Sequence, residues 1–216
     1  VCLAVNYAHQ KRLLHLDLKP SNILVSTIDG VPVPKIIDFG IALQLDREAV
    51  GKAEASVGIG TPNYAALEML DPKREALDLD TRADVYSLGV LLYELMSGFL
   101  PRTVTRGSSG QMLEQLRKAE ALAPSDRLAA EVSQSLKIAS ARNTTARRLR
   151  GSLSGDLDAI CLKALSLDRE ARYGGALELG LDIQRVIDGK PVSARDSTPI
   201  YRTQKFLRRN WVPVSL

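Results

Sequence analysis

The sequence predicts a mainly helical domain of the α+β class, in which several helices accompany one small antiparallel β-hairpin. Three observations lead to this prediction. One strongly apolar segment, 81–96, has the length of a helix, shorter amphipathic segments follow it, and two apolar runs flank a turn signal near the N-terminus. The chain has 216 residues, of which 45% are hydrophobic and 25% charged, so it can bury one substantial core.

Composition narrows the class of protein further. A net charge of +4 is too small to indicate nucleic-acid binding by itself. Cys2 and Cys161 lie far apart and form no metal-binding spacing, and so few cysteines fit a reducing compartment. The sequence shows no signal peptide and no complete transmembrane run. We therefore expect a cytoplasmic globular domain with no nucleic-acid partner.

The stretch 15–22, His-Leu-Asp-Leu-Lys-Pro-Ser-Asn, follows the end of a helix over 1–12 and places an acid, a base and an amide on one short loop. Asn22 opens an apolar run, a turn signal follows at 29–30, and a second apolar run ends at Asp38. Two such runs predict an antiparallel hairpin over about 23–38. Its geometry brings Asn22 beside Asp38. A carboxylate and an amide oxygen suit a hard cation such as Mg²⁺.

The segment 81–96 is the strongest helix of the sequence. Thr81 is a good N-cap residue, and Asp84 follows it three positions on. The segment leaves little polar surface, which is typical of a buried helix, and Gly98 is a natural terminator. We expect this helix to be the central pillar of the domain.

The remaining elements follow from pattern and composition. Segment 41–63 is polar and predicts a long loop, and 124–154, rich in Ser, Ala and Arg, predicts a solvated connection rather than a docking patch. Further helices are predicted over 111–122, 156–165, 176–187 and 201–209, the last one basic and preceded by Thr198 and Pro199.

Two ordered motifs carry a family resemblance. His15-Leu16-Asp17-Leu18-Lys19-Pro20-Ser21-Asn22, followed by Asp38-Phe39-Gly40, resembles the catalytic core of eukaryotic-type serine/threonine protein kinases, including the similar bacterial ones. The resemblance covers roughly residues 1–190 and implies a kinase C-terminal lobe. The glycine-rich loop, strand lysine and helix glutamate of the N-terminal lobe have no counterpart here, so we expect a fragment without that lobe.

The resemblance implies the chemistry residue by residue. Asp17 matches the catalytic base, which orients a substrate hydroxyl and accepts its proton. Lys19 matches the residue that neutralises charge on the transferred phosphate. Thr61 matches the residue that braces the aspartate and the lysine. The implied reaction transfers the γ-phosphate of ATP to serine or threonine of a protein substrate.

Nucleotide and metal binding are implied in the same way. Asn22 and Asp38 match the ligands of Mg²⁺, for which Mn²⁺ is an alternative. Leu24 matches the residue beneath the adenine ring, although burial in the strand core explains a leucine there equally.

Structural roles are implied for His15, Phe39, Gly40, Glu68, Asp84 and Arg172. His15, Phe39 and Gly40 belong to the two motifs and couple the loop to the fold. Glu68 closes the activation segment and pairs with Arg172, the alternative being two unrelated solvated charges. Asp84 accepts hydrogen bonds from the loop backbone, and helix capping is the alternative that we favour less.

Two departures keep a second function open. Leu16 stands where the family usually has the arginine that pairs with an activation-loop phosphate, and Leu67 replaces the proline of Ala-Pro-Glu. A pseudokinase, a scaffold or binding module that keeps the fold without turnover, is therefore the alternative. The intact kinase residues Asp17, Lys19, Asn22 and Asp38 favour an enzyme.

The C-terminal stretch 191–216 is expected to hold a basic helix and the start of a juxtamembrane segment. A basic flank precedes the apolar stub 211–216, which fits a membrane anchor just beyond the C-terminus of a longer parent protein. An ordinary frayed terminus fits about as well.

Overall fold

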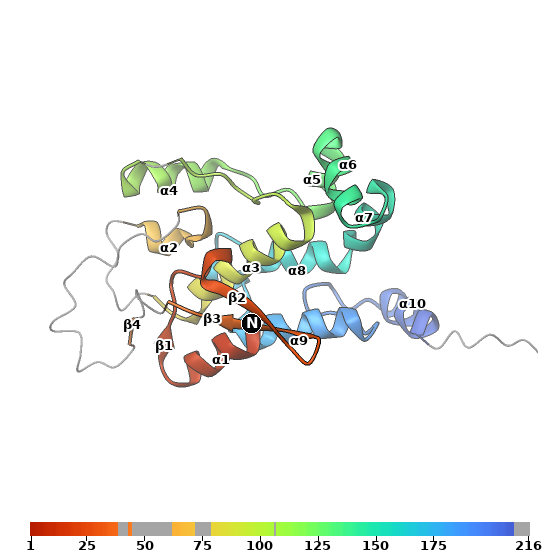
Figure 1. Ribbon diagram of the computed structural model, residues 1–216, viewed down its shortest axis with the longest axis horizontal. Coiled ribbons are helices and arrows are strands. Elements are labelled where there is room, and N and C mark those ends of the chain that lie inside the picture. Colours follow the sequence, from red (N-terminus) through yellow and green to blue (C-terminus); the bar gives the residue numbers. More distant parts are fainter. Residues whose placement is uncertain (39–42, 45–61, 72–78, 106, 210–216) are drawn as a thin grey trace, which may run out of the picture.

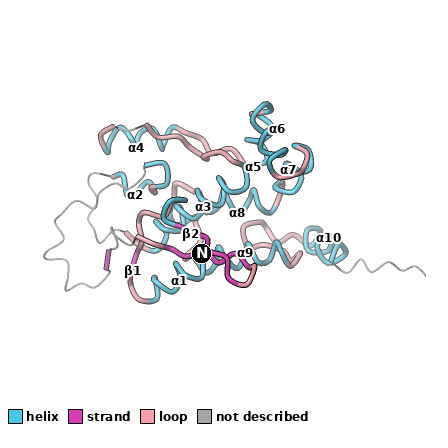
Figure 2. Tube along the Cα trace, in the orientation of Figure 1, coloured by secondary structure: helices cyan, strands magenta, loops and turns pink. Residues whose placement is uncertain are grey.

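The computed structural model describes residues 1–38, 43–44, 62–71, 79–105 and 107–209 (Figure 1). This part of the chain is mainly helical and contains a small two-stranded antiparallel hairpin (Figure 2). The predicted fold class, α+β with helices dominant, is confirmed.

The helices share one body, with α3 running through its middle. They are α1 (Cys2–Gln10), α2 (Leu67–Leu70), α3 (Thr81–Ser97), α4 (Ser109–Lys118), α5 (Pro124–Ala130), α6 (Val132–Ala141), α7 (Ala146–Leu153), α8 (Asp156–Ala164), α9 (Ala176–Ile187) and α10 (Pro199–Arg209). The strands are β1 (Leu13–Leu14), β2 (Ile23–Ile28), β3 (Val31–Ile36) and β4 (Leu43–Gln44), paired as β1–β4 and β2–β3. None of the helices in the described part is long and apolar enough to cross a membrane.

Helix α3 is the pillar that the sequence predicts. It packs against α1, α5, α8 and α9, and most of its side chains are buried. Its cap differs from the prediction: Asp80 is the N-cap and accepts a hydrogen bond from the Arg82 N–H at 2.8 Å, while the Thr81 hydroxyl donates to the Gly174 carbonyl. Gly98 ends the helix with φ +77°, a left-handed conformation that favours glycine.

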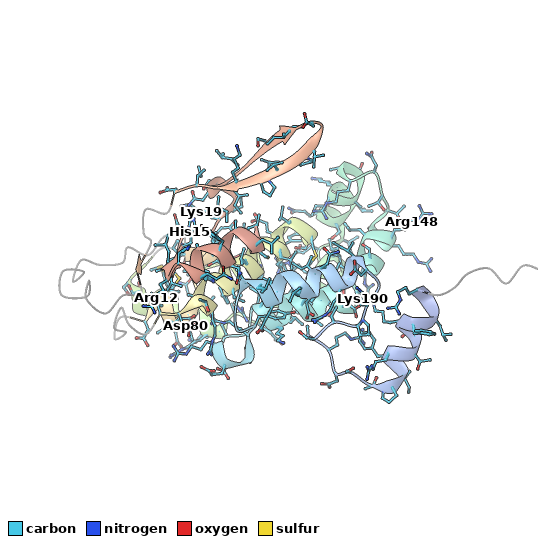
Figure 3. The ribbon with its side chains drawn as sticks, turned by 90° about the horizontal axis from the view of Figure 1, so that it is seen from below. Arg12, His15, Lys19, Asp80, Arg148 and Lys190 are labelled. Carbon is cyan, nitrogen blue, oxygen red and sulfur yellow. The ribbon has the colours of Figure 1, made fainter. Side chains whose placement is uncertain are left out.

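The hairpin has the predicted strands and turn. Ile23 pairs with Ile36 and Ile28 with Val31. Asp29 and Gly30 make the turn with φ of +50° and +78°, as a type I′ turn requires. The hairpin projects from the helical body (Figure 3). Its apolar side chains are therefore largely exposed, as at Leu24, Val25, Ile28 and Val31.

The prediction of a solvated connection over 124–154 is wrong. This segment forms α5, α6 and α7, which gather around a small core of Leu128, Ala139, Leu149 and Leu153. Met96 and Phe99, from the end of α3 and just beyond it, pack against this cluster, so the three short helices complete their core with residues from outside the segment. Arg142 fixes α6 to the end of α3 by donating to the Leu95 and Met96 carbonyls.

The stretch that directly follows α9 is bound to the helical body. Buried Asp182 of α9 accepts hydrogen bonds from the Ser193 N–H at 2.8 Å and the Ala194 N–H at 2.9 Å. Burial alone would raise the pKa of Asp182, but donors including Ser193, Arg185 and Tyr173 outweigh it and hold the pKa below its usual value. Residues 191–195 are thereby tied to α9.

Candidate active site

The loop between β1 and β2 gathers the acid, the base and the amide of the sequence motif. Lys19 Nζ lies 2.7 Å from Asp17 Oδ2. Asn22 Nδ2 donates to the same carboxylate oxygen at 3.1 Å and to the Asp17 carbonyl at 2.8 Å. Figure 3 shows Lys19 and His15 near the base of the hairpin. The Asp17 carboxylate is thus fixed by one cation and one amide.

Asp84 on α3 holds the backbone of this loop. Its Oδ2 accepts the His15 N–H at 2.9 Å and its Oδ1 accepts the Leu16 N–H at 2.8 Å. Leu16 has φ +62°, which costs a leucine about 1–3 kcal/mol. The two hydrogen bonds to a buried carboxylate offset that cost, so α3 determines the conformation of the loop.

His9 was missed by sequence reasoning. Its Nε2 lies 2.8 Å from Asp84 Oδ2, and its side chain is 6% exposed. Because Asp84 is fully buried, a hydrogen-bond donor of this kind compensates part of its desolvation. The one available signal was rarity, since the chain has only two histidines and both precede Asp17.

His15 is buried and joins the loop to the hairpin. Its Nδ1 lies 3.3 Å from the Asp17 N–H nitrogen, and its Nε2 lies 3.2 Å from the Ile37 carbonyl oxygen. The first contact uses Nδ1 as an acceptor and the second fits a donor at Nε2, so the two ring nitrogens join the loop to the end of the hairpin.

The open end of the hairpin brings Asn22 and Asp38 into neighbouring positions. Ile37 N–H donates to the Asn22 carbonyl at 3.0 Å, and Asp38 follows directly with φ +61°. Both Asn22 Nδ2 hydrogen bonds go to Asp17, and the described residues show no partner for Asn22 Oδ1 or for the Asp38 carboxylate. Two oxygen donors at one strand end fit Mg²⁺, which commonly takes one or two protein ligands with substrate phosphates.

No group of three or more His, Cys, Asp or Glu side chains suited to a metal occurs in the described part of the chain. Leu24 lies on the adjacent strand with 53% of its surface exposed, so burial in the strand core does not explain it. Thr61, Phe39 and Gly40 fall outside the described residues.

Leu16, the main departure from the kinase pattern, is 2% exposed. It belongs to the core cluster that includes Ala65, Ala66, Met69 and Leu70. These four residues lie in α2 and directly before it. The leucine is thus an apolar packing residue at the position where the resembled family usually has arginine.

Glu68 and Arg172 form a bidentate ion pair across the helical body. Arg172 Nη1 lies 2.6 Å from Glu68 Oε1, and Nη2 lies 2.9 Å from Oε2. The guanidinium is fully buried and also donates to the carbonyls of Ser166, Arg82 and Leu167. One side chain therefore joins α2, the start of α3 and the turn after α8.

We predict that Arg172→Gln lowers the free energy of unfolding by about 3–5 kcal/mol, because it leaves the Glu68 carboxylate and three carbonyls without their donor. Arg169→Gln, in the same turn but at a side chain 45% exposed, should cost less than about 1 kcal/mol. Urea denaturation followed by circular dichroism measures both. Equal midpoints for the two variants would contradict a structural role for Arg172.

Comparison with known proteins gives independent evidence for the family. The sequence profile of the protein kinase domain matches residues 1–179. The chain is 34% identical over 194 residues to serine/threonine-protein kinase PknB of Mycobacterium tuberculosis, covering 89% of this chain and 26% of that protein. PknB of Mycobacterium leprae is 33% identical with the same coverage. A probable serine/threonine-protein kinase of Streptomyces coelicolor is 30% identical over 191 residues, 88% of this chain and 24% of the relative. The chain spans about a quarter of the length of these curated relatives.

Proposed function

The chain belongs to the protein kinase family, and on this premise we propose that it is the C-terminal lobe of a protein kinase that phosphorylates serine or threonine of protein substrates. One observation carries the proposal: the Asp17 carboxylate is held by Lys19 Nζ and Asn22 Nδ2 on a loop fixed to α3. Transfer of labelled phosphate from ATP to a basic protein, lost in Asp17→Asn, tests it.

In the proposed mechanism the chain positions groups and neutralises charge. Asp17 Oδ2 orients the substrate hydroxyl and accepts its proton, because its two donors fix where the carboxylate points. The Lys19 side chain is 24% exposed, so it can turn toward a transferred phosphoryl group and balance its charge. A lysine two positions after the acid resembles serine/threonine rather than tyrosine kinases.

ATP and Mg²⁺, or Mn²⁺, complete the proposed site. The bound nucleotide supplies the phosphoryl group, and the metal balances charge on its phosphates. Asn22 Oδ1 and the Asp38 carboxylate would hold the metal, and the exposed Leu24 would lie beneath the adenine ring. Thr61 would brace Asp17 and Lys19.

The proposal includes an N-terminal lobe in a longer parent protein. The elements that grip the nucleotide phosphates from above in this family have no counterpart in the 216 residues. The relatives are about four times as long as the matched region. We place the kinase domain of the parent in the cytoplasm, with a membrane anchor beyond the basic helix and an ordinary frayed terminus as the two alternatives.

A pseudokinase is the second candidate, and Leu16 and Leu67 are the observations that favour it. Leu16 is buried among apolar side chains, so it offers no charge to a phosphorylated activation segment. Leu67 occupies the first position of α2, at which the proline of the family's Ala-Pro-Glu would also fit the helix. Both leucines are apolar, and the groups that hold the Asp17 carboxylate are Lys19 and Asn22, so we rank the enzyme first.

Regulation is predicted to be independent of activation-loop phosphorylation. Ser56 is the only serine or threonine between Gly40 and Thr61, and it lies outside the described residues. Since Leu16 cannot pair with a phosphate, Ser56→Ala in the parent should leave basal kinase activity largely intact. A loss of about a hundredfold in initial rate, equal to about 2.7 kcal/mol, would overturn this prediction.

A further inference from the structure

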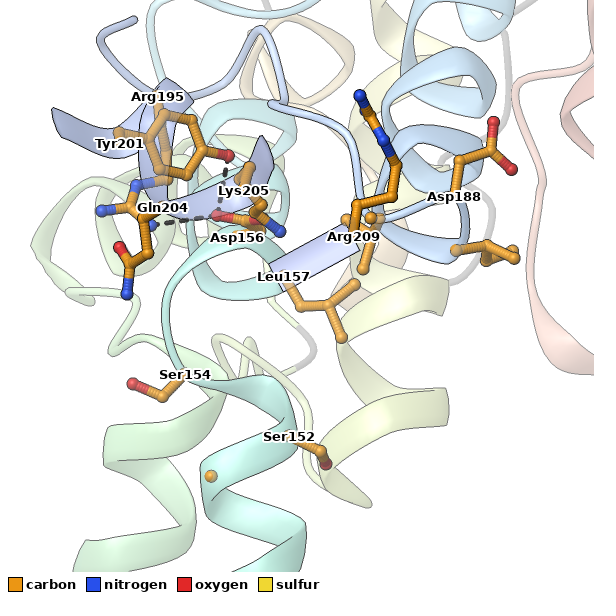
Figure 4. Close-up of a pocket in the computed structure, with 14 residues that line it drawn as sticks. Ser152, Ser154, Asp156, Leu157, Asp188, Arg195, Tyr201, Gln204, Lys205 and Arg209 are labelled. Carbon is orange, nitrogen blue, oxygen red and sulfur yellow. Dashed lines mark hydrogen bonds and ion pairs between the residues drawn. The ribbon is translucent and has the colours of Figure 1, made fainter. Parts of the chain in front are cut away.

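A cleft of about 670 Å³ lies at the end of the molecule away from the catalytic loop. Its walls are the turn between α7 and α8, the last turn of α9 and one face of α10 (Figure 4). Among the described residues, none of those assigned to phosphate transfer lines it. The kinase chemistry therefore does not account for this cleft.

The cleft carries an excess of positive charge. Asp156 at its base is 2.5 Å from Lys205 Nζ and 3.0 Å from Arg195 Nη1, and it accepts a hydrogen bond from the Tyr201 hydroxyl at 3.0 Å. Burial alone would raise the pKa of Asp156, but these donors outweigh it and hold the pKa below its usual value. The carboxylate therefore stays ionised. Two cations thus share one carboxylate, and Arg209 adds a third.

The other carboxylate of the lining does not cancel this excess. Asp188 is already paired with Lys190 at 2.8 Å. The cleft therefore keeps cations whose charge its own acids do not balance, which favours an anionic ligand.

Helix α7 extends the same charge beyond the cleft. Residues 132–155 contain five cations and no acid. Arg147, Arg148 and Arg150 are exposed, and the described part of the chain gives them no ion-pair partner. Gly151 and Ser152 of the same helix line the cleft. Arg148 projects at the same end of the molecule as α10 (Figure 3). We call the cleft together with these three arginines the α7–α10 surface.

The cleft also has an apolar part. Leu157, Val186 and Ile187 line it, and Ile187 is 73% exposed. A ligand with only charged groups would leave these side chains uncovered. An aliphatic group set between carboxylates would cover them and meet the cations at the same time.

We propose that the α7–α10 surface binds an acidic peptide segment of a partner protein, with an aliphatic side chain seated against Ile187 between flanking carboxylates. A concave, cation-lined cleft suits an extended peptide better than a flat bilayer. Nucleic acid is disfavoured because the only aromatic ring of the lining, Tyr201, is covered by Arg195 at 4.6 Å and Lys205 at 6.0 Å from the ring centre.

Fluorescence anisotropy with a labelled Glu-Glu-Leu-Glu-Glu peptide and the 216-residue chain tests the proposal without nucleotide, so its outcome is independent of kinase activity. Arg147→Gln/Arg148→Gln/Arg150→Gln should weaken binding tenfold or more, and Arg209→Gln severalfold. The matched control Lys35→Gln/Arg117→Gln/Lys118→Gln removes the same charge from other exposed positions and should change binding less than twofold. Replacing the peptide leucine by serine, or Ile187 by asparagine, should each weaken binding severalfold.

Three outcomes would overturn the proposal. Equal weakening by both triple variants would show nonspecific attraction. No loss on replacing the leucine would remove the apolar part of the site. Tighter binding to phosphatidylserine vesicles or to a DNA oligonucleotide, competing with the peptide, would assign the surface to a membrane or a nucleic acid instead.

Discussion

The 216-residue chain alone is expected to bind ATP weakly and to transfer no measurable phosphate. Asp17, Lys19, Asn22 and Asp38 supply one wall of the proposed site, and nothing in this sequence holds the β- and γ-phosphates from above. Positioning contributes about 7–11 kcal/mol in favourable cases. At 1.36 kcal/mol per tenfold, losing much of it slows transfer by many powers of ten.

A version that carries a kinase N-terminal lobe should transfer phosphate to serine or threonine, and Asp17→Asn in that version should abolish the transfer. Asparagine keeps the size of the side chain but cannot accept the hydroxyl proton and no longer balances Lys19. Radiolabelled ATP with a generic basic protein, applied to all three proteins, measures the effect. A circular-dichroism melt of the variant separates lost chemistry from lost folding.

Results that contradict these two predictions would distinguish between the explanations. Robust, Asp17-dependent turnover by the isolated chain would refute the argument that two walls are needed. An inactive protein with a complete N-terminal lobe would favour the pseudokinase. The hairpin makes aggregation of the isolated chain a concern to control for, because it exposes Leu24, Val25, Ile28 and Val31 together.

Leu91→Asp should unfold the domain. Leu91 is 5% exposed and packs in the core cluster that α3 shares with α8 and α9. A buried unpaired charge costs several kcal/mol, against a total stability of about 5–15 kcal/mol for a domain. Leu92 is only partly buried, so Leu91 is the sharper site of the two.

Leu95→Asp is the matched control on the same helix. Leu95 is 72% exposed, and the same substitution there should cost less than about 1 kcal/mol. Thermal melts of both variants, with size-exclusion profiles, provide the measurement. A soluble Leu91→Asp protein that melts cooperatively at the wild-type midpoint would show that α3 is not the pillar of the fold.

Local sequence determined several elements in advance. The turn at Asp29 and Gly30 set the hairpin and its register, because only a few residue types adopt positive φ at both central positions. The apolar run over 81–96 predicted α3 because it leaves little polar surface for solvent. Motif spacing placed Asp17, Lys19 and Asn22 on one loop, and the structure brings their side chains together.

The features that the sequence did not predict share a physical cause: the contacts that determine them join distant parts of the chain. Segment 124–154 has ordinary polar composition, and its three helices form because Leu128, Ala139, Leu149 and Leu153 meet in space. His9 and Asp84 are 75 positions apart, and no periodicity relates them. Leu95 follows the apolar pattern of α3 yet lies on its exposed side, since exposure depends on what packs against each turn.

The sequence by itself determined the family, the loop that gathers Asp17, Lys19 and Asn22, and the main helix, because each depends on residue types at short fixed spacings. Only the tertiary structure decided how that loop is held and what surrounds it. Asp84 fixes the backbone of Leu16 from 68 positions away, and Asp156 collects Arg195, Tyr201 and Lys205 into one cleft. A buried charge is costly unless it is paired or hydrogen-bonded, so each of these carboxylates has partners in the folded protein. The order of residues along the chain does not show which partners those are.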